Sequence, residues 1–162
     1  MDLNTLKKKF EELFKQPDMK AFFSPGRINL IGEHTDYNGG NVFPCAITLG
    51  TYALATKRDD TLIKLYSENF SELGVITIDL NNLEDDPADK WTNYPKGMIK
   101  FLKEAGYVID HGLNILYYGT IPNGAGLSSS ASIELLTGFI VQDLFELKLD
   151  RLDLIKTGQR VE

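Results

Sequence analysis

The chain has 162 residues, of which 43% are hydrophobic and 25% are charged. These values are ordinary for a soluble globular protein, and the length allows one domain with a sizeable core. With 17 Lys and Arg against 23 Asp and Glu, the net charge is −6. That balance argues against a nucleic-acid partner, because such a partner requires a basic surface.

The sequence also argues against a membrane location. No apolar stretch approaches the roughly 20 residues that a helix needs to cross a bilayer. The N-terminus lacks the basic-then-apolar pattern of a secretion signal. The single cysteine, Cys45, cannot form an internal disulfide, so we expect a reducing, cytoplasmic location. Because Cys45 lies in the apolar run 42–47, it is predicted to be an inert thiol in the core.

The first half of the chain predicts one helix followed by strands. Apolar residues at helical spacing indicate a helix from about Leu3 to Phe14. A short strand at 21–24 is expected to end at Pro25-Gly26, and the polar stretch 27–40 closes on a turn signal. Further strands are predicted at 42–47, 51–57, 61–67 and 75–80.

The second half alternates helix and strand after an acidic loop at 81–90. A helix is predicted at 94–105, where Gly106 ends it, and a strand follows at 113–118. The next helix, 129–147, is apolar over much of its circumference and is therefore expected to be central and buried. A last helix begins after Asp150 and meets no stop signal, so we expect an N-terminal piece of a longer protein. Together these elements predict an α+β domain with one mixed sheet and helices packed on one face.

The stretch Pro-Asn-Gly-Ala-Gly-Leu-Ser-Ser-Ser-Ala at 122–131 joins the predicted strand 113–118 to the apolar helix. Its glycines allow a tight turn close to a ligand, and a helix start offers unpaired N–H groups to a phosphate. The alternative is that the serines only cap the helix. No Lys follows the second glycine, so this is not the P-loop motif, and positive charge must come from elsewhere.

A second polar cluster, Gly-Glu-His-Thr-Asp-Tyr, occupies residues 32–37 next to the turn. Clustered hydrogen-bonding side chains suit a sugar, because each buried hydroxyl needs a partner. Zinc is a weaker alternative, since no second His or Cys lies nearby, and a solvated polar loop is another. Arg27, just before this cluster, is a fixed cation whose planar fork suits phosphate, although it could also form a surface ion pair.

The stretch 26–40, Gly-Arg-Ile-Asn-Leu-Ile-Gly-Glu-His-Thr-Asp-Tyr-Asn-Gly-Gly, resembles the galactokinase signature. The stretch 122–131, called the serine loop below, is similar to the phosphate-binding motif of the wider family of galactokinase, homoserine kinase, mevalonate kinase and phosphomevalonate kinase. The resemblance covers the whole chain and implies a ribosomal protein S5 domain 2-like fold. Residues 1–162 would form the N-terminal galactose- and ATP-binding domain, with the active site against an absent C-terminal domain.

The resemblance also implies roles for individual residues. Arg27 would stabilise charge in the transition state, and Ser130 and Glu162 would serve Mg²⁺. The galactose-binding residues would be Glu33, His34, Thr35 and Asp36. The ATP-binding residues would be Ser67, Trp91, Gly124, Ala125, Gly126, Leu127, Ser128, Ser129 and Ser130. A core role for Trp91 remains an alternative, and for Tyr94 the core role is favoured.

The implied reaction is the ATP-dependent phosphorylation of α-D-galactose to galactose 1-phosphate, the first committed step of galactose catabolism. The partners would be galactose, ATP and the C-terminal domain, with no nucleic acid and no membrane. The family's catalytic aspartate falls beyond residue 162, so we expect this piece alone to be inactive, with the apolar segment 133–147 left uncovered. Two alternatives remain: a non-catalytic galactose- and ATP-sensing regulator, which the intact serine loop disfavours, and an N-acetylgalactosamine kinase.

Overall fold

The computed structural model describes residues 2–32, 34–35, 38–122 and 127–162. The described residues form an α+β fold with a five-stranded sheet of order β1-β2-β5-β3-β4, which confirms the predicted fold class. The strands are β1 (Lys20–Ile31), β2 (Phe43–Lys57), β3 (Leu62–Ser67), β4 (Ile76–Asp79) and β5 (Leu113–Gly119). The helices are α1 (Leu3–Phe14), α2 (Asn93–Glu104), α3 (Ser129–Leu144) and α4 (Arg151–Val161), with short 3₁₀ helices η2 (Glu68–Leu73) and η3 (Pro87–Thr92).

The sheet is mixed, as predicted. β3 and β5 run parallel, whereas the pairs β1–β2, β2–β5 and β3–β4 are antiparallel. The connection from β3 to β5 passes through η2, β4, η3 and α2, which is the long crossover that a parallel pair requires.

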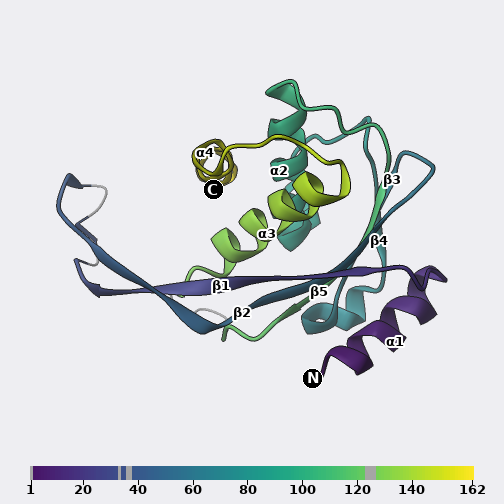
Figure 1. The fold of residues 1–162 in the computed structure, drawn as a ribbon, viewed down its shortest axis with the longest axis horizontal. Helices are drawn as coiled ribbons and strands as arrows, with labels where there is room; N and C mark the ends of the chain where they lie inside the picture. Colours follow the sequence, from purple (N-terminus) through teal and green to yellow (C-terminus); the bar gives the residue numbers. More distant parts are fainter. Residues whose placement is uncertain (1, 33, 36–37, 123–126) are drawn as a thin grey trace.

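Helices cover both faces of the sheet (Figure 1). On one face, α2, α3 and α4 enclose the main hydrophobic core, as predicted. On the other face lies α1, whose Leu6 and Phe10 pack on Leu54, Tyr66 and Leu116 in a smaller core. We predicted all the helices on one face of the sheet, and for α1 this prediction is wrong.

The first two strands are longer than predicted and extend beyond the sheet as an arm (Figure 1). Pro25-Gly26 does not end β1, and the predicted strands 42–47 and 51–57 are one strand, β2. The pairing shifts from Pro25 opposite Gly50 to Arg27 opposite Ala46, so β2 carries extra residues where the arm begins. Cys45 lies on this arm and is exposed, so the prediction of a core thiol is wrong.

The predicted central helix is covered from within the chain. Leu136, Ile140 and Val141 of α3 are buried in the main core, so the expectation that segment 133–147 would be left uncovered is wrong. Phe139 is the exception in that segment, at 45% exposed. Large apolar side chains that are more than half exposed occur on the arm, at Leu30, Ile31 and Phe43, and also at Val108, Leu152 and Ile155. Within the described residues, no helix has the length and hydropathy needed to cross a membrane.

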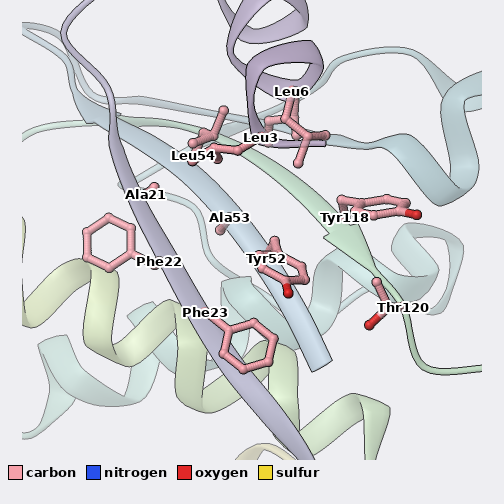
Figure 2. A pocket seen from close by; sticks show the side chains of 11 residues that line it. Leu3, Leu6, Ala21, Phe22, Phe23, Tyr52, Ala53, Leu54, Tyr118 and Thr120 are labelled. Carbon is pink, nitrogen blue, oxygen red and sulfur yellow. The ribbon is translucent and has the colours of Figure 1, made fainter. Parts of the chain in front are cut away.

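An apolar pocket lies between α1 and the sheet (Figure 2). Its volume is about 500 Å³, and its walls are mostly apolar side chains of α1, β1, β2 and β5. Phe23 and Tyr52 both line it, with ring centroids 4.6 Å apart. Residues with a predicted role are absent from its lining, so the size of this pocket does not identify the candidate site.

Candidate active site

The tip of the arm carries the predicted galactose-binding residues. Glu33 and Asp36 lie outside the described residues, whereas His34 and Thr35 form part of a turn. The Thr35 hydroxyl contacts the carbonyl oxygens of Gly32 and Asn41, and the Thr35 carbonyl accepts the Gly40 N–H at 2.8 Å. Thr35 therefore closes the turn. His34, with φ of +63°, is an exposed residue in the left-handed region.

The serine loop leads into α3 as predicted. Gly124, Ala125 and Gly126 lie outside the described residues, so their predicted contact with phosphate stays a prediction. Ser128 is the N-cap of α3, but its backbone is left-handed and its side chain makes no capping hydrogen bond. An N-cap residue normally has an extended backbone that lets its oxygen reach the first turn. Plain capping by Ser128 therefore does not explain this loop.

The two predicted clusters meet through the backbone. The Arg27 N–H donates to the carbonyl oxygen of Leu127 at 3.3 Å, which joins β1 to the serine loop. Gly26 permits this approach, because a Cβ there would lie 3.0 Å from the same oxygen. One turn into α3, the buried Ser132 hydroxyl lies 2.9 Å from the Ser24 carbonyl oxygen and 3.0 Å from the Thr51 hydroxyl. The start of α3 is thus fixed to the first two strands.

A pocket of about 260 Å³ opens beside this helix start. Predicted ATP-binding residues from three separate parts of the chain line it together: Ser67, Trp91, Ser129 and Ser130. Trp91 also packs against the main core, with its ring centroid 5.8 Å from that of Tyr117. Its indole Nε1 is buried without a hydrogen-bond partner among the described residues. A buried donor of this kind is suited to a ligand acceptor.

Asn69 and Tyr94 line the same pocket, and Asn69 was missed from the sequence. The Asn69 side chain pairs with the backbone of Gly119: it donates to the carbonyl at 2.9 Å and accepts the N–H at 2.7 Å. These two bonds fix η2 against the end of β5. In the sequence, an asparagine just after a strand resembles any turn residue, so no signal marked it. Tyr94, for which the core role was favoured, is half-buried at the pocket wall.

The predicted metal-binding residues, 32 positions apart in sequence, lie in contact. The Ser130 hydroxyl donates a short hydrogen bond to the Glu162 carboxylate. No group of three or more His, Cys, Asp and Glu suited to a metal occurs within the described ranges. A hydroxyl and a carboxylate are nevertheless oxygen donors that fit a hard divalent cation, which completes its coordination with phosphate and water.

Glu134 is a carboxylic acid beside this pair that the sequence analysis did not single out. It lies one turn beyond Ser130 on α3 and is 1% exposed. Burial, with a further contribution from the charge of Glu162, raises the pKa of Glu134 to about 8. Its Oε1 atom is buried and has no partner among the described residues. The available signal was a single acidic residue inside an otherwise apolar run, Ile133 to Leu136.

Comparison with known families gives two matches along the chain. The galactokinase galactose-binding signature matches residues 8–57, which include the arm, and the GHMP kinases N terminal domain matches residues 93–162. A galactokinase of Streptococcus suis is 62% identical over 162 residues, and one of Streptococcus mutans is 59% identical. Each match covers 100% of this chain and 42% of the relative, so the chain spans about two-fifths of their length.

Solved structures agree with these matches. The crystal structure of Lactococcus lactis galactokinase complexed with galactose has a TM-score of 0.95 and 56% identity, over 98% of this chain and 41% of that one. Methanococcus jannaschii mevalonate kinase shares the fold, with a TM-score of 0.75 at 22% identity over 91% of this chain and 47% of its own. The chain therefore matches the N-terminal region of galactokinases, with a galactose-binding signature followed by a GHMP kinases N terminal domain.

Proposed function

We propose that residues 1–162 form the N-terminal, galactose- and ATP-binding domain of a galactokinase that transfers phosphate from ATP to the anomeric hydroxyl of α-D-galactose. A C-terminal domain would complete the active site, and the whole is called the full-length protein below. The cytoplasmic location expected from the sequence is part of this proposal. Exposed apolar residues of the arm, such as Ile31 and Phe43, are consistent with a further domain packing there.

One observation carries the proposal. Ser67, Trp91, Ser129 and Ser130 come from distant parts of the chain and line one pocket. The strand that leads to the galactokinase signature is hydrogen-bonded to the serine loop beside that pocket, through Arg27 and Leu127. A nucleotide in the pocket and a sugar at the arm would therefore lie on either side of Arg27.

The chemistry follows from positioning and charge. Phosphoryl transfer has a loose, charge-rich transition state, so a site that fixes both substrates and offsets charge supplies most of the rate. Arg27 would stabilise that charge, since its guanidinium pairs with no carboxylate among the described residues. Glu33, His34 and Asp36 would hold sugar hydroxyls. Mg²⁺, held by Ser130 and Glu162, would neutralise phosphate charge.

The test is sugar-dependent ADP release by the full-length protein with galactose, glucose and N-acetylgalactosamine. We expect the full-length protein to turn over galactose. Residues 1–162 alone should show no turnover above background, because no residue in this range is assigned as the catalytic aspartate. Asp36→Ala should raise the galactose KM by about 10- to 150-fold, the loss of one charged hydrogen bond, at an unchanged ATP KM. Ser130→Ala should instead impair the use of MgATP.

Three outcomes would contradict the proposal. Binding of both ligands without ADP release would favour the regulator. Preference for N-acetylgalactosamine would favour the sibling kinase. Asp36→Ala kinetics equal to those of the wild type would remove Asp36 from the sugar site.

A further inference from the structure

Glu134 has a buried oxygen that nothing in the described structure satisfies. The residue is 1% exposed, and Oε1 has no hydrogen-bond partner among the described residues. Leaving a buried carboxyl oxygen unpaired costs free energy, so buried polar groups almost always have a protein, water or ion partner. None of the ion pairs among the described residues involves Glu134. The missing partner is therefore sought among ligands.

The contacts between α3 and α4 locate this oxygen. Ser130 contacts Glu162. One turn along α3, Glu134 faces Gly158, where an added Cβ would lie 3.7 Å from Oε2. One turn further, Gly138 faces Leu154, whose Cδ1 would lie 2.2 Å from an added Cβ. The two helices are thus antiparallel and contact each other in three successive layers: Ser130 with Glu162, Glu134 with Gly158, and Gly138 with Leu154. The carboxyl of Glu134 lies against the backbone of α4 at Gly158.

Side chains on a helix lean toward its N-terminus. Glu134 therefore leans along α3 toward Ser130, while its Oε2 lies against Gly158 of α4. The Ser130 hydroxyl, one turn away on α3, contacts the Glu162 carboxylate. The contribution of Glu162 to the pKa of Glu134 agrees with this proximity. The donors that meet there are all oxygen atoms.

Oxygen donors of this kind are the ligands that Mg²⁺ prefers. Mg²⁺ takes oxygen ligands and in nucleotide sites is held by one or two carboxylates together with phosphate oxygens and water. Ser130 and Glu162 supply one hydroxyl and one carboxylate. A second carboxylate from Glu134 stays within that number and gives the orphaned oxygen a partner.

We propose that Glu134 is a further ligand of the divalent cation, acting with Ser130 and Glu162. The inference rests on the proposed function, which places a cation beside the nucleotide phosphates. It adds a residue one turn inside α3 to the cation site. The cation would then bind closer to the contact between α3 and α4 than with Ser130 and Glu162 alone.

The test is Mn²⁺ binding to the full-length protein, measured by electron paramagnetic resonance with a non-hydrolysable ATP analogue present. Glu134→Gln keeps the shape of the side chain and removes its ability to ionise and bind a cation as a carboxylate. We expect it to weaken Mn²⁺ binding by about 10- to 100-fold. The matched control is Glu68→Gln, since Glu68 also has a buried oxygen without a partner among the described residues but lies in η2, away from the contact between α3 and α4. It should bind Mn²⁺ as the wild type does. Affinity of Glu134→Gln within twofold of the wild type would overturn the inference.

Melting temperatures separate a ligand role from a structural one. Without metal, Glu134→Gln should melt at or above the wild-type temperature at a pH above about 8, because the amide has no charge to bury. The rise in melting temperature that saturating Mn²⁺ and nucleotide give the wild type should shrink in the variant. If Glu134→Gln does not fold, Glu134→Asp, which draws the carboxylate back by one methylene, serves instead. Wild-type Mn²⁺ affinity in that variant would equally count against the inference.

Failure of the inference and failure of the proposed function are distinguishable. If the wild type phosphorylates galactose while Glu134→Gln binds Mn²⁺ normally, only the inference falls. If the wild type turns over no sugar, the proposed function falls, and the Mn²⁺ affinities of wild type and Glu134→Gln still decide the role of Glu134.

Discussion

Two glycines in the interior of helices should respond oppositely to the same substitution. Gly138 lies in α3 and Gly158 in α4. Alanine is favoured over glycine in a helix interior by about 0.8–1.0 kcal/mol. An added methyl at Gly158 would meet its nearest neighbours at 3.5–3.7 Å, which is ordinary contact. Gly158→Ala should therefore raise the free energy of unfolding by about 0.5–1 kcal/mol.

At Gly138 the same methyl collides with the core. The added Cβ would lie 2.2 Å from Leu154 Cδ1, and Leu154 is only 2% exposed, so its side chain has little room to move. Overfilling a packed core costs about 1–3 kcal/mol. After the gain in helix propensity, Gly138→Ala should lower the free energy of unfolding by up to about 2 kcal/mol.

The assay is urea unfolding followed by the fluorescence of Trp91, the single tryptophan, which packs against the core. Leu154→Val, which shortens the colliding side chain, provides the control. The double variant should lose less unfolding free energy than the sum of the losses in the two single variants, because the shorter side chain relieves the collision. If Gly138→Ala stabilised the protein as much as Gly158→Ala does, the layers between α3 and α4 would be wrong, and with them the position of Glu134.

Two further predictions concern the pH dependence of stability and the pocket wall. Because burial raises the pKa of Glu134 to about 8 from 4.5, the folded state holds a proton that the unfolded chain loses between these values. The stabilisation from this proton is complete below pH 4.5 and is lost as pH rises through about 8, at up to about 1.4 kcal/mol per pH unit. The urea midpoint of Glu134→Gln should lack this dependence on pH. Asn69→Ala removes both bonds to Gly119 and should cost about 1–2 kcal/mol of stability while raising the ATP KM of the full-length protein at constant galactose KM; unchanged stability and kinetics would mean that Asn69 does not hold the pocket wall.

Local patterns predicted the helices well because their signals lie within each segment. The helix expected at 94–105 is α2, Asn93–Glu104, and Gly106 follows it with φ of +93°. Strand length is different, since it depends on pairing. Pro25-Gly26 reads as a break in the sequence, yet β1 continues because β2 supplies partners on both sides of the bulge.

The face of the sheet that a helix covers was harder to predict from the sequence than the helix itself. The periodicity of α1 predicts an apolar stripe through Leu6 and Phe10 but does not specify the side of the sheet that receives it. Cys45 shows the same limit. An apolar run indicates burial only where the sheet has a covered face, and β2 has left the covered part of the sheet at that point.

The candidate site divides in the same way. Its loop and its polar cluster stand out in the sequence, and the family resemblance supplied Ser67, Trp91 and Glu162, which no local pattern marks. Glu134 was passed over because an apolar helix was taken as core. A single acid in such a run contradicts the hydrophobic pattern, and contradictions of this kind concentrate at functional sites.

The site and the core are parts of one packing arrangement. Ser132 fixes the start of α3 to β1 and β2, so the positions of Ser130 and Glu134 follow from the sheet. Gly138, two turns along, sets how closely α4 approaches, because Leu154 occupies the space that a side chain would fill. Closer or looser packing there would shift Glu162 at the far end of α4 relative to Ser130. Gly138, which lies outside the candidate site, thereby contributes to the contact between Ser130 and Glu162.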